Sequence, residues 1–150
     1  MSRKAIIFLV LLILAPVVIY VLWPSDESRI RKLFREGAKA IEQKKIEDVM
    51  ARVSFNYTDE YGLTYLYIKE GMTRTFQRMN DIKIEYEITG IDIKDTSATA
   101  ELDIRVIASQ GTDTGYVIGD AARPVHMKFN LDKQRTTWLV IRTEGLPLNF

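Results

Sequence analysis

The sequence has no cysteine and a single histidine, His126, among its 150 residues. Without cysteine there is no disulfide, no thiolate ligand for a metal and no cysteine nucleophile. The attachment of a bacterial lipoprotein is excluded as well, because its lipid is carried on a cysteine. One histidine alone leaves no adequate set of ligands for a structural zinc site. We therefore predict neither a bound metal nor a cofactor.

An excess of charge of one sign is also missing. The chain has 21 basic and 20 acidic residues, and 19 basic against 20 acidic residues remain beyond position 24. A neutral domain without a basic stripe binds the phosphate backbone of nucleic acids poorly. Nucleic acid is therefore not among the expected partners.

One stretch lacks charge altogether. Ala5 to Trp23 is uncharged and is interrupted only by Pro16 and Tyr20. As a helix it spans about 28 Å, close to the hydrocarbon thickness of a bilayer. A cleaved signal peptide is the alternative, but its shorter apolar region ends in small residues, whereas this one ends in bulky ones. We predict an uncleaved signal anchor, with residues 1–24 forming a cytoplasmic tail and a transmembrane helix.

The charges that flank this span favour one orientation. Arg3 and Lys4 precede it and acidic residues follow it, which favours a cytoplasmic N-terminus. We expect a single-pass protein of the inner (cytoplasmic) membrane with a periplasmic or otherwise extracytoplasmic domain. The reverse orientation stays open, because four basic residues also follow the span closely: Arg29, Arg31, Lys32 and Arg35. On a folded helix these residues form a solvated face or, alternatively, a face that meets lipid head groups.

The domain that follows should occupy residues 25–147, with residues 148–150 as a short tail. Helical spacing of apolar residues and alternation of apolar with polar residues mark its first half. The expected elements are a helix over residues 27–43, a short helix over 46–50, a strand over 53–57 and a third helix over 63–79.

The second half of the domain reads as a series of antiparallel strands. The longest feature is a hairpin of residues 82–88 and 98–108, which flank a turn near Lys94 and Asp95. The glycine-rich residues 109–121 are expected to form a loop, although Tyr116–Ile118 could pack back onto the domain. The last two strands are expected at residues 125–131 and 136–143.

This order of elements resembles the nuclear transport factor 2-like superfamily, whose α+β cones are also described as SnoaL-like or cystatin-like. Residues 53–62 resemble the strand and acidic turn before the third helix of small bacterial members, and residues 138–142 resemble their closing strand. The resemblance covers about residues 27–147. It implies an α+β fold in which a transmembrane helix is followed by three helices packed on a curved, mainly antiparallel sheet. It fixes no function, because the superfamily includes isomerases, dehydratases, transport factors and assembly domains.

The inward positions of the predicted strands are apolar, and only Tyr86 among them carries a polar atom. Enzymes that resemble this fold place an acidic or basic side chain inside the cone, where it would interrupt the row of apolar inward positions. This sequence shows no such interruption. A hollow cone would instead bind an apolar small molecule. Its lining would come from Tyr65, Met72, Phe76, Tyr86, Leu102, Ile104, Met127 and Phe129.

The remaining candidates for acid–base chemistry are Tyr57, Asp59, Tyr61 and His126. In the resembling folds, the loop that carries the first three lies near the mouth of the cone. Asp59 would bind a cation or act as a base there, and the alternative is a turn in which its carboxylate accepts backbone N–H groups. Alternation places His126 on the outer face of its strand, so we expect an exposed or interface side chain.

Two functions are compatible with these features. We expect a membrane-anchored domain that acts without catalysis as a ligand-binding or complex-assembly module, and the alternative is a small isomerase- or dehydratase-type enzyme. The expected partners are the lipid bilayer and a second copy or another subunit of a membrane complex. A homodimer would form through an outward apolar patch of the sheet, which we place at Ile107, Trp138 and Val140, unless Tyr116–Ile118 covers it.

Overall fold

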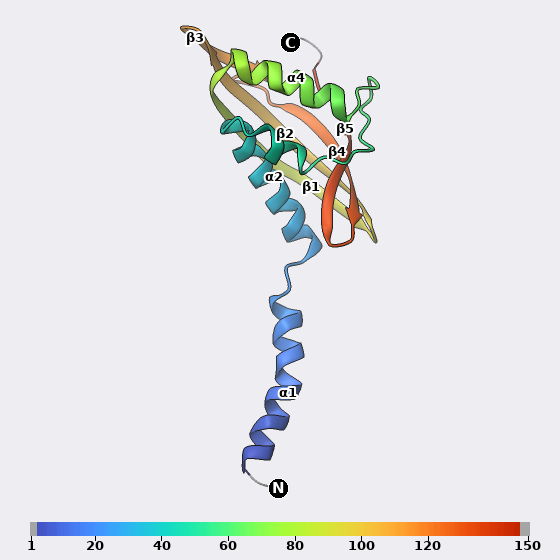
Figure 1. Ribbon diagram of the computed structural model, residues 1–150. Helices are drawn as coiled ribbons and strands as arrows, with labels where there is room; N and C mark the ends of the chain where they lie inside the picture. Colours follow the sequence, from blue (N-terminus) through green and yellow to red (C-terminus); the bar gives the residue numbers. More distant parts are fainter. Residues whose placement is uncertain (1–2, 148–150) are drawn as a thin grey trace.

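The computed structural model describes residues 3–147. Its first element, α1 (Arg3–Leu22), is a 20-residue helix that leads away from the rest of the chain (Figure 1). None of its side chains is buried, and it is the one helix within residues 3–147 that is long and apolar enough to cross a membrane. Ala5 and Pro16 lie inside this helix, and Trp23 follows directly after it. The predicted apolar helix is confirmed, whereas its retention and orientation stay predictions.

Three further helices precede the sheet. α2 (Asp26–Glu42) begins at an N-cap, Ser25, whose hydroxyl accepts a 3.1 Å hydrogen bond from the backbone N–H of Ser28. Such a cap satisfies one of the free donors of the first turn. α3 is a single short helix (Ile46–Met50), and α4 follows after a loop (Tyr65–Arg78). All three lie within two residues of the predicted bounds.

Five antiparallel strands form one sheet. Their bounds are β1 (Asn80–Lys94), β2 (Ser97–Gln110), β3 (Asp113–Ile118), β4 (Val125–Gln134) and β5 (Thr137–Glu144). The strand order is β1-β2-β4-β5, and β3 pairs with β2 off this path. The three helices α2, α3 and α4 lie together against one side of the sheet (Figure 1). The predicted α+β architecture is confirmed.

A register shift in β1 keeps its apolar side chains on the inner face. Ile88 pairs with Leu102, but the next pair along the two strands is Gly90 with Glu101, so one residue of β1 has no partner in β2. This bulge moves the apolar positions from even to odd numbers, and Ile91 and Ile93 therefore pack against the same core as Ile88. The outer edge of β1 is capped by a side chain, because the backbone N–H of Ile84 donates a 2.9 Å hydrogen bond to the Glu42 carboxylate.

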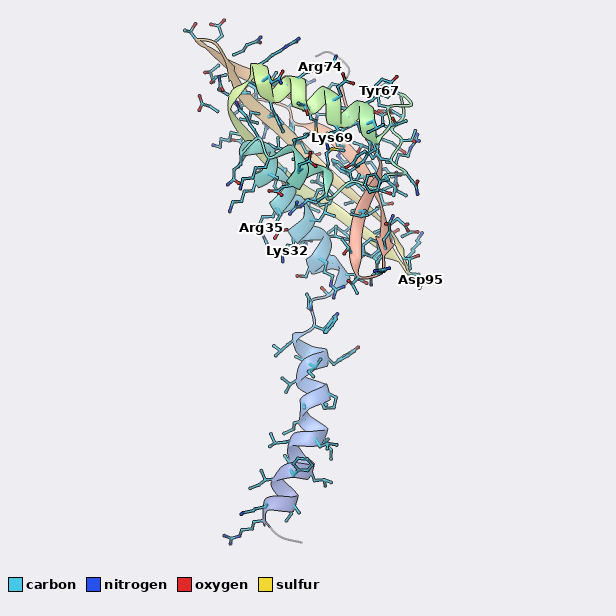
Figure 2. All side chains as sticks on the ribbon, in the orientation of Figure 1. Lys32, Arg35, Tyr67, Lys69, Arg74 and Asp95 are labelled. Atoms are coloured by element: carbon cyan, nitrogen blue, oxygen red, sulfur yellow. The ribbon has the colours of Figure 1, made fainter. Side chains whose placement is uncertain are left out.

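The core lies between α2 and the sheet. Ile30 and Phe34 of α2 are buried against Leu102 of β2 and Leu131 of β4. The rings of Phe34 and Phe129 pack edge to face, with 5.0 Å between ring centroids. Charged side chains such as Lys32, Arg35, Lys69, Arg74 and Asp95 point away from this core (Figure 2).

Two predicted elements are wrong. Residues 53–57 form no strand, because Val53 makes only an isolated parallel bridge to Val140 while the chain turns at Ser54. Residues 109–121 are not all loop, because β3 forms within them. β4 pairs with β2 only as far as Ile104, so the last residues of β2 need another neighbour, and β3 supplies it.

Candidate functional site

Asp59 holds the loop that leads into α4. The residue is 3% exposed, and its Oδ1 accepts hydrogen bonds from the backbone N–H groups of Tyr61 and Leu63 at 2.9 and 2.8 Å. A carboxylate that satisfies two backbone donors just before a helix forms a turn of the kind that Asp favours. Its other oxygen, Oδ2, is buried and has no hydrogen-bond partner within residues 3–147. Of the two roles considered for Asp59, the turn is the one observed.

Tyr57 is buried as part of the core cluster. Burial raises the pKa of its hydroxyl, a hydrogen bond with Thr143 partly offsets this rise, and the charge of Asp59 adds to it. A phenol with a raised pKa stays protonated at neutral pH. In its protonated form, Tyr57 can donate or accept a hydrogen bond.

Tyr61 and its neighbour Glu60 fasten the same loop to the segment after β5. The Tyr61 hydroxyl donates a 3.1 Å hydrogen bond to the backbone oxygen of Leu146, and the backbone N–H of Gly145 donates to Glu60 at 2.8 Å. Partial desolvation raises the pKa of Tyr61, and the adjacent Glu60 adds to the rise. Through these contacts the Tyr61 side chain stabilises the position of the loop against the segment after β5.

His126 lies on the outer face of the sheet, as the alternation predicts. Its Nδ1 is 2.8 Å from Asp103 Oδ1 on the neighbouring strand, and its Nε2 is 3.9 Å from Glu101 Oε2. Its interactions are therefore with the outer face, whereas Asp59 is buried in the loop before α4. The structure does not bring the four predicted acid–base residues together. Within residues 3–147, no group of three or more His, Asp or Glu side chains is arranged to hold a metal.

The predicted pocket residues are buried or half-buried, and none of them lines either of the two hollows described below. Leu102 and Met127 are buried, and four others pack half-buried against the core cluster: Tyr65, Tyr86, Ile104 and Phe129. Met72 and Phe76 lie half-buried on α4. The role of these eight residues in binding an apolar molecule stays a prediction.

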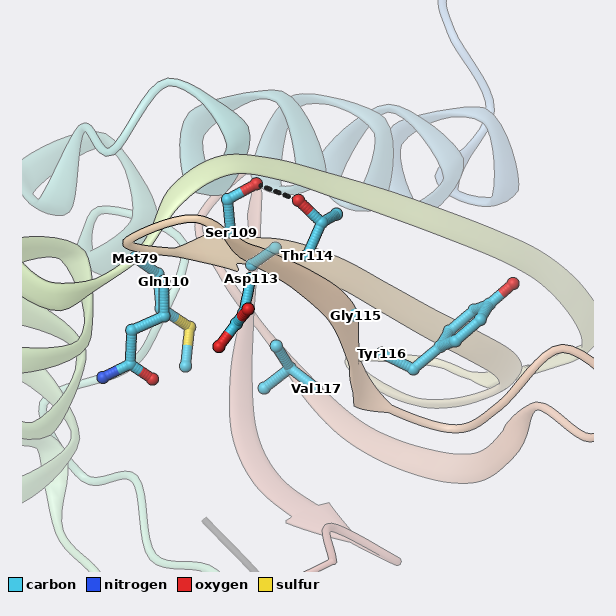
Figure 3. Close-up of a pocket in the computed structure, with 9 residues that line it drawn as sticks. Met79, Ser109, Gln110, Asp113, Thr114, Gly115, Tyr116 and Val117 are labelled. Atoms are coloured by element: carbon cyan, nitrogen blue, oxygen red, sulfur yellow. Dashed lines mark hydrogen bonds between the residues drawn. The ribbon is translucent and has the colours of Figure 1, made fainter.

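The first hollow is a pocket of about 230 Å³ beside the β2–β3 hairpin (Figure 3). Met79, Gln110 and Val117 contribute to its lining, and the hydroxyls of Ser109 and Thr114 lie 2.8 Å apart at its edge. Two of its lining residues, Asp113 and Tyr116, have ionisable side chains. Figure 3 shows the Tyr116 ring directed away from Asp113, so the two do not form a pair for acid–base work.

The second hollow is a groove of about 490 Å³ at the end of the domain next to α1, and we call it the linker groove. It begins at Pro24 and continues along one side of α2. Its lining residues are Pro24, Ser28, Arg29, Lys32, Leu33, Glu36, Ala51, Arg52, Thr136, Thr137 and Trp138.

Comparison with known proteins finds solved structures with a similar architecture. No family model and no curated protein matches the sequence. A candidate scytalone dehydratase from Novosphingobium aromaticivorans is similar in structure, with a TM-score of 0.66 and 12% identity over 79% of this chain and 80% of that one. A domain with a cystatin-like fold from Nostoc punctiforme gives a TM-score of 0.62 at 21% identity, over 82% and 79% of the two chains. Bd1075 of Bdellovibrio bacteriovorus gives 0.64 at 14% identity, and this chain spans 40% of its length.

The chain has the nuclear transport factor 2-like fold. At these identities the likeness concerns the fold alone, and the fold hosts more than one kind of function. The predicted nuclear transport factor 2-like fold is confirmed.

This nuclear transport factor 2-like domain exposes an apolar surface that sequence reasoning missed. Phe55, Leu66 and Tyr67 are 84%, 72% and 67% exposed, and we call them the aromatic patch. The Phe55 ring leans on Tyr65 with 4.7 Å between ring centroids, so the patch joins the loop to the start of α4. α4 lies on the side of the domain opposite α1, where Tyr67 points outward (Figure 2).

The dimer interface predicted for the outer face is wrong at two of its three residues. Trp138 is 2% exposed and Val140 is also buried, because β5 turns both toward α2 and the core. The alternating positions Leu139 and Ile141 are the outward ones.

These outward residues do not extend the surface around Ile107. Leu139 pairs with Asp132, which pairs with Ser97 at the start of β2. Ile107 is ten residues further along the same strand, about 33 Å away at the usual rise, and it pairs with Tyr116 of β3. The contiguous patch is absent, so self-association stays a prediction without this surface to support it.

Proposed function

We propose that this chain is a membrane-anchored, extracytoplasmic domain of the nuclear transport factor 2-like fold that acts without catalysis, by docking a second protein. The observation that carries the proposal is the aromatic patch. Three large side chains are each about two-thirds or more exposed, Phe55 in the loop and Leu66 and Tyr67 in the first turn of α4. Large apolar side chains exposed in neighbouring segments of a soluble domain are typical of protein-interaction sites.

The location of the patch suits a docking role. α1 is an exposed apolar helix of membrane-spanning length, and the patch lies on the opposite side of the domain (Figure 1). A partner bound there would meet no obstruction from the bilayer. Aromatic side chains also contribute strongly to binding, because they bury a large area and lose few rotamers.

The positions of the candidate catalytic residues support the same conclusion. Asp59 is committed to a turn, Tyr57 is buried with a raised pKa, and His126 pairs with Asp103 on the outer face. A general acid or base must lie within hydrogen-bond reach of a reacting group. These three residues do not converge on either hollow.

The test is site-specific photo-crosslinking from position 70 of the full chain, next to the patch, in native membranes. Glu70 is exposed on α4, so a crosslinker there leaves the patch intact. A discrete crosslinked product should form and should be lost in Leu66→Glu and Tyr67→Glu. The control variant Gln77→Glu adds the same charge at an exposed site on α4 and should keep the product. A product that survives both patch variants would remove the aromatic patch from the proposal.

The alternative, an isomerase- or dehydratase-type enzyme, is favoured by one observation. Asp59 Oδ2 is buried without a hydrogen-bond partner in the described part of the chain, residues 3–147, and the charge of Asp59 contributes to the raised pKa of Tyr57. Asp59→Asn separates the two functions, because an amide still offers one acceptor oxygen to the turn but cannot take a proton. The docking proposal expects the crosslinked product to persist in this variant. An enzyme would keep its fold and lose its activity in cells.

A further inference from the structure

The linker groove is basic. Its charged lining consists of Arg29, Lys32 and Arg52 against a single acid, Glu36. Glu36 lies 2.8 Å from Arg52 and 3.7 Å from Lys32, so the carboxylate engages Arg52 closely and Lys32 only loosely. The Arg52 guanidinium, by hydrogen bonding, holds the pKa of Glu36 below its usual range. Two positive charges therefore remain in excess.

The other acid near the groove is already neutralised. Asp26, in the first turn of α2, lies 2.9 Å from the Lys133 ammonium and accepts a 3.1 Å hydrogen bond from the indole of Trp138. The charge of Arg29 also acts on Asp26, but the hydrogen bonds of this carboxylate are made with Lys133 and Trp138 and not with Arg29 or Lys32. The hydroxyls of Ser28, Thr136 and Thr137 also line the groove and provide hydrogen-bond donors next to the cations. Cations combined with hydroxyl donors form a favourable environment for a phosphate group.

The groove lies directly against the end of the apolar helix. Pro24 lines it, and the Arg29 guanidinium sits 5.7 Å from the centre of the Trp23 ring. Tryptophan at the end of a transmembrane helix marks the level of the lipid head groups. Arg29 and Lys32 lie about 4.5 and 9 Å along α2 from its first residue, which is comparable with the thickness of the head-group layer. Figure 2 shows Lys32 at the end of the domain that faces α1.

We propose that the linker groove binds the phosphate head group of an anionic phospholipid from the membrane that holds α1. The proposal rests on the anchoring part of the proposed function and is independent of the aromatic patch. The phosphodiester would lie between Arg29 and Lys32, and the acyl chains would continue alongside α1. Such binding would fix the tilt of the domain relative to the membrane surface, which the three-residue linker between α1 and α2 alone does not do.

The test is native mass spectrometry of the full chain in neutral detergent. The protein is offered equal amounts of phosphatidylglycerol and phosphatidylcholine with identical acyl chains. One phosphatidylglycerol should be retained in preference to phosphatidylcholine. Lys32→Gln, whose side chain is exposed, should weaken this retention about fivefold, the effect expected for one basic residue near anionic lipid. Arg29→Gln should weaken it at least as much.

The matched control is Arg31→Gln. Arg31 lies on the same helix between the two groove residues and carries the same charge, but it pairs with Glu27 outside the groove. It should leave retention unchanged. An equal loss in Arg31→Gln and Lys32→Gln would mean general surface attraction, and equal retention of the two lipids would mean that the groove does not select an anionic head group. Either result overturns the proposal.

Two further measurements separate the remaining outcomes. Millimolar inorganic phosphate should not displace the bound lipid, and displacement together with phosphate binding to lipid-free protein would identify a free phosphate as the ligand instead. Alkaline carbonate extraction of native membranes tests the anchoring by itself. A chain released by carbonate would contradict the anchoring, whereas a retained chain without lipid selectivity would contradict the groove alone.

Discussion

The indole Nε1 of Trp138 donates a 3.1 Å hydrogen bond to Asp26 Oδ1, which joins the last strand to the first turn of α2 across 112 residues. Lys133 of β4 contacts the same carboxylate at 2.9 Å. The acid also lies at the N-terminus of α2, where a negative charge is favourable. One side chain thus connects the point where the domain leaves α1 to the end of its sheet.

This connection predicts a specific dependence of stability on pH. The hydrogen bond from Lys133 holds the pKa of Asp26 below its usual value, so the contact stabilises the folded protein above about pH 4 and is lost as the pH falls further. Asp26→Asn should cost about 1–2 kcal/mol at pH 7, and the difference from wild type should shrink below pH 4. Urea unfolding between pH 3 and 7 measures this. A constant difference across that range would contradict the assignment.

The register of β2 makes a paired prediction about the core. Leu102 is buried on the inner face while Glu101 is exposed on the outer one. Leu102→Ala should cost about 2–5 kcal/mol of unfolding free energy and Glu101→Ala less than about 0.5. Phe76→Ala should cost less than Leu102→Ala, because α4 has no fully buried residue. Similar losses at positions 101 and 102 would mean that the strand register is wrong by one residue.

Substitutions at two glycines with positive φ distinguish the cost of backbone strain from the cost of a steric clash. A Cβ at Gly62, where φ is +78°, would meet no atom within 4 Å, whereas one at Gly145, where φ is +86°, would lie 2.5 Å from the backbone oxygen of His126. Gly62→Ala should cost about 1–2 kcal/mol from strain alone. Gly145→Ala should cost about 1–3 kcal/mol more, because β4 must shift. Thermal unfolding of the two variants provides the comparison, and equal costs would show that the segment after β5 is not fixed against β4.

The orientation of α1 gives a prediction for cells. A reporter that is active only outside the cytoplasm should be active when fused after Phe150, and a cytoplasm-only reporter at the same position should be silent. Mass spectrometry of the mature protein should find residues 1–24 still attached. The reverse reporter pattern would place the domain in the cytoplasm, and a mature chain that starts near Ser25 would mean that the apolar helix is a cleaved signal peptide.

Most of the fold was predicted from the regular alternation of apolar and polar residues. The inner residues of β1, β2 and β4 follow a period of two over long runs, and α2 follows helical spacing, so local patterns identify these elements directly. The segment at residues 53–57 also alternates, but Ser54 and Tyr57 are used in a turn that depends on contact with β5. β3 was missed because glycines weaken its pattern, and it forms only where β2 lacks another neighbour.

The candidate sites were less predictable because they depend on distant contacts. From the sequence, Asp59 was compatible with a turn and with a role in chemistry. The positions of the Tyr61 and Leu63 N–H groups in the structure show that its carboxylate forms the turn. β5 has apolar residues on both faces, so sequence did not reveal that Trp138 points inward. The linker groove combines Arg29, Arg52 and Thr136, which come from three separate parts of the chain.

The capped and bulged edge of β1 has a consequence for chains that share a membrane. Identical anchored domains are confined to two dimensions and meet edge to edge, and a long exposed edge strand would invite them to pair into a continuous sheet. The Glu42 carboxylate occupies the Ile84 N–H, and the irregularity at Gly90 breaks the straight run of the strand. At the opposite edge, the backbone of residues 52–58 forms hydrogen bonds with β5 at Val140 and Ile141. Each of these two edges is thus interrupted, which disfavours lateral pairing along it.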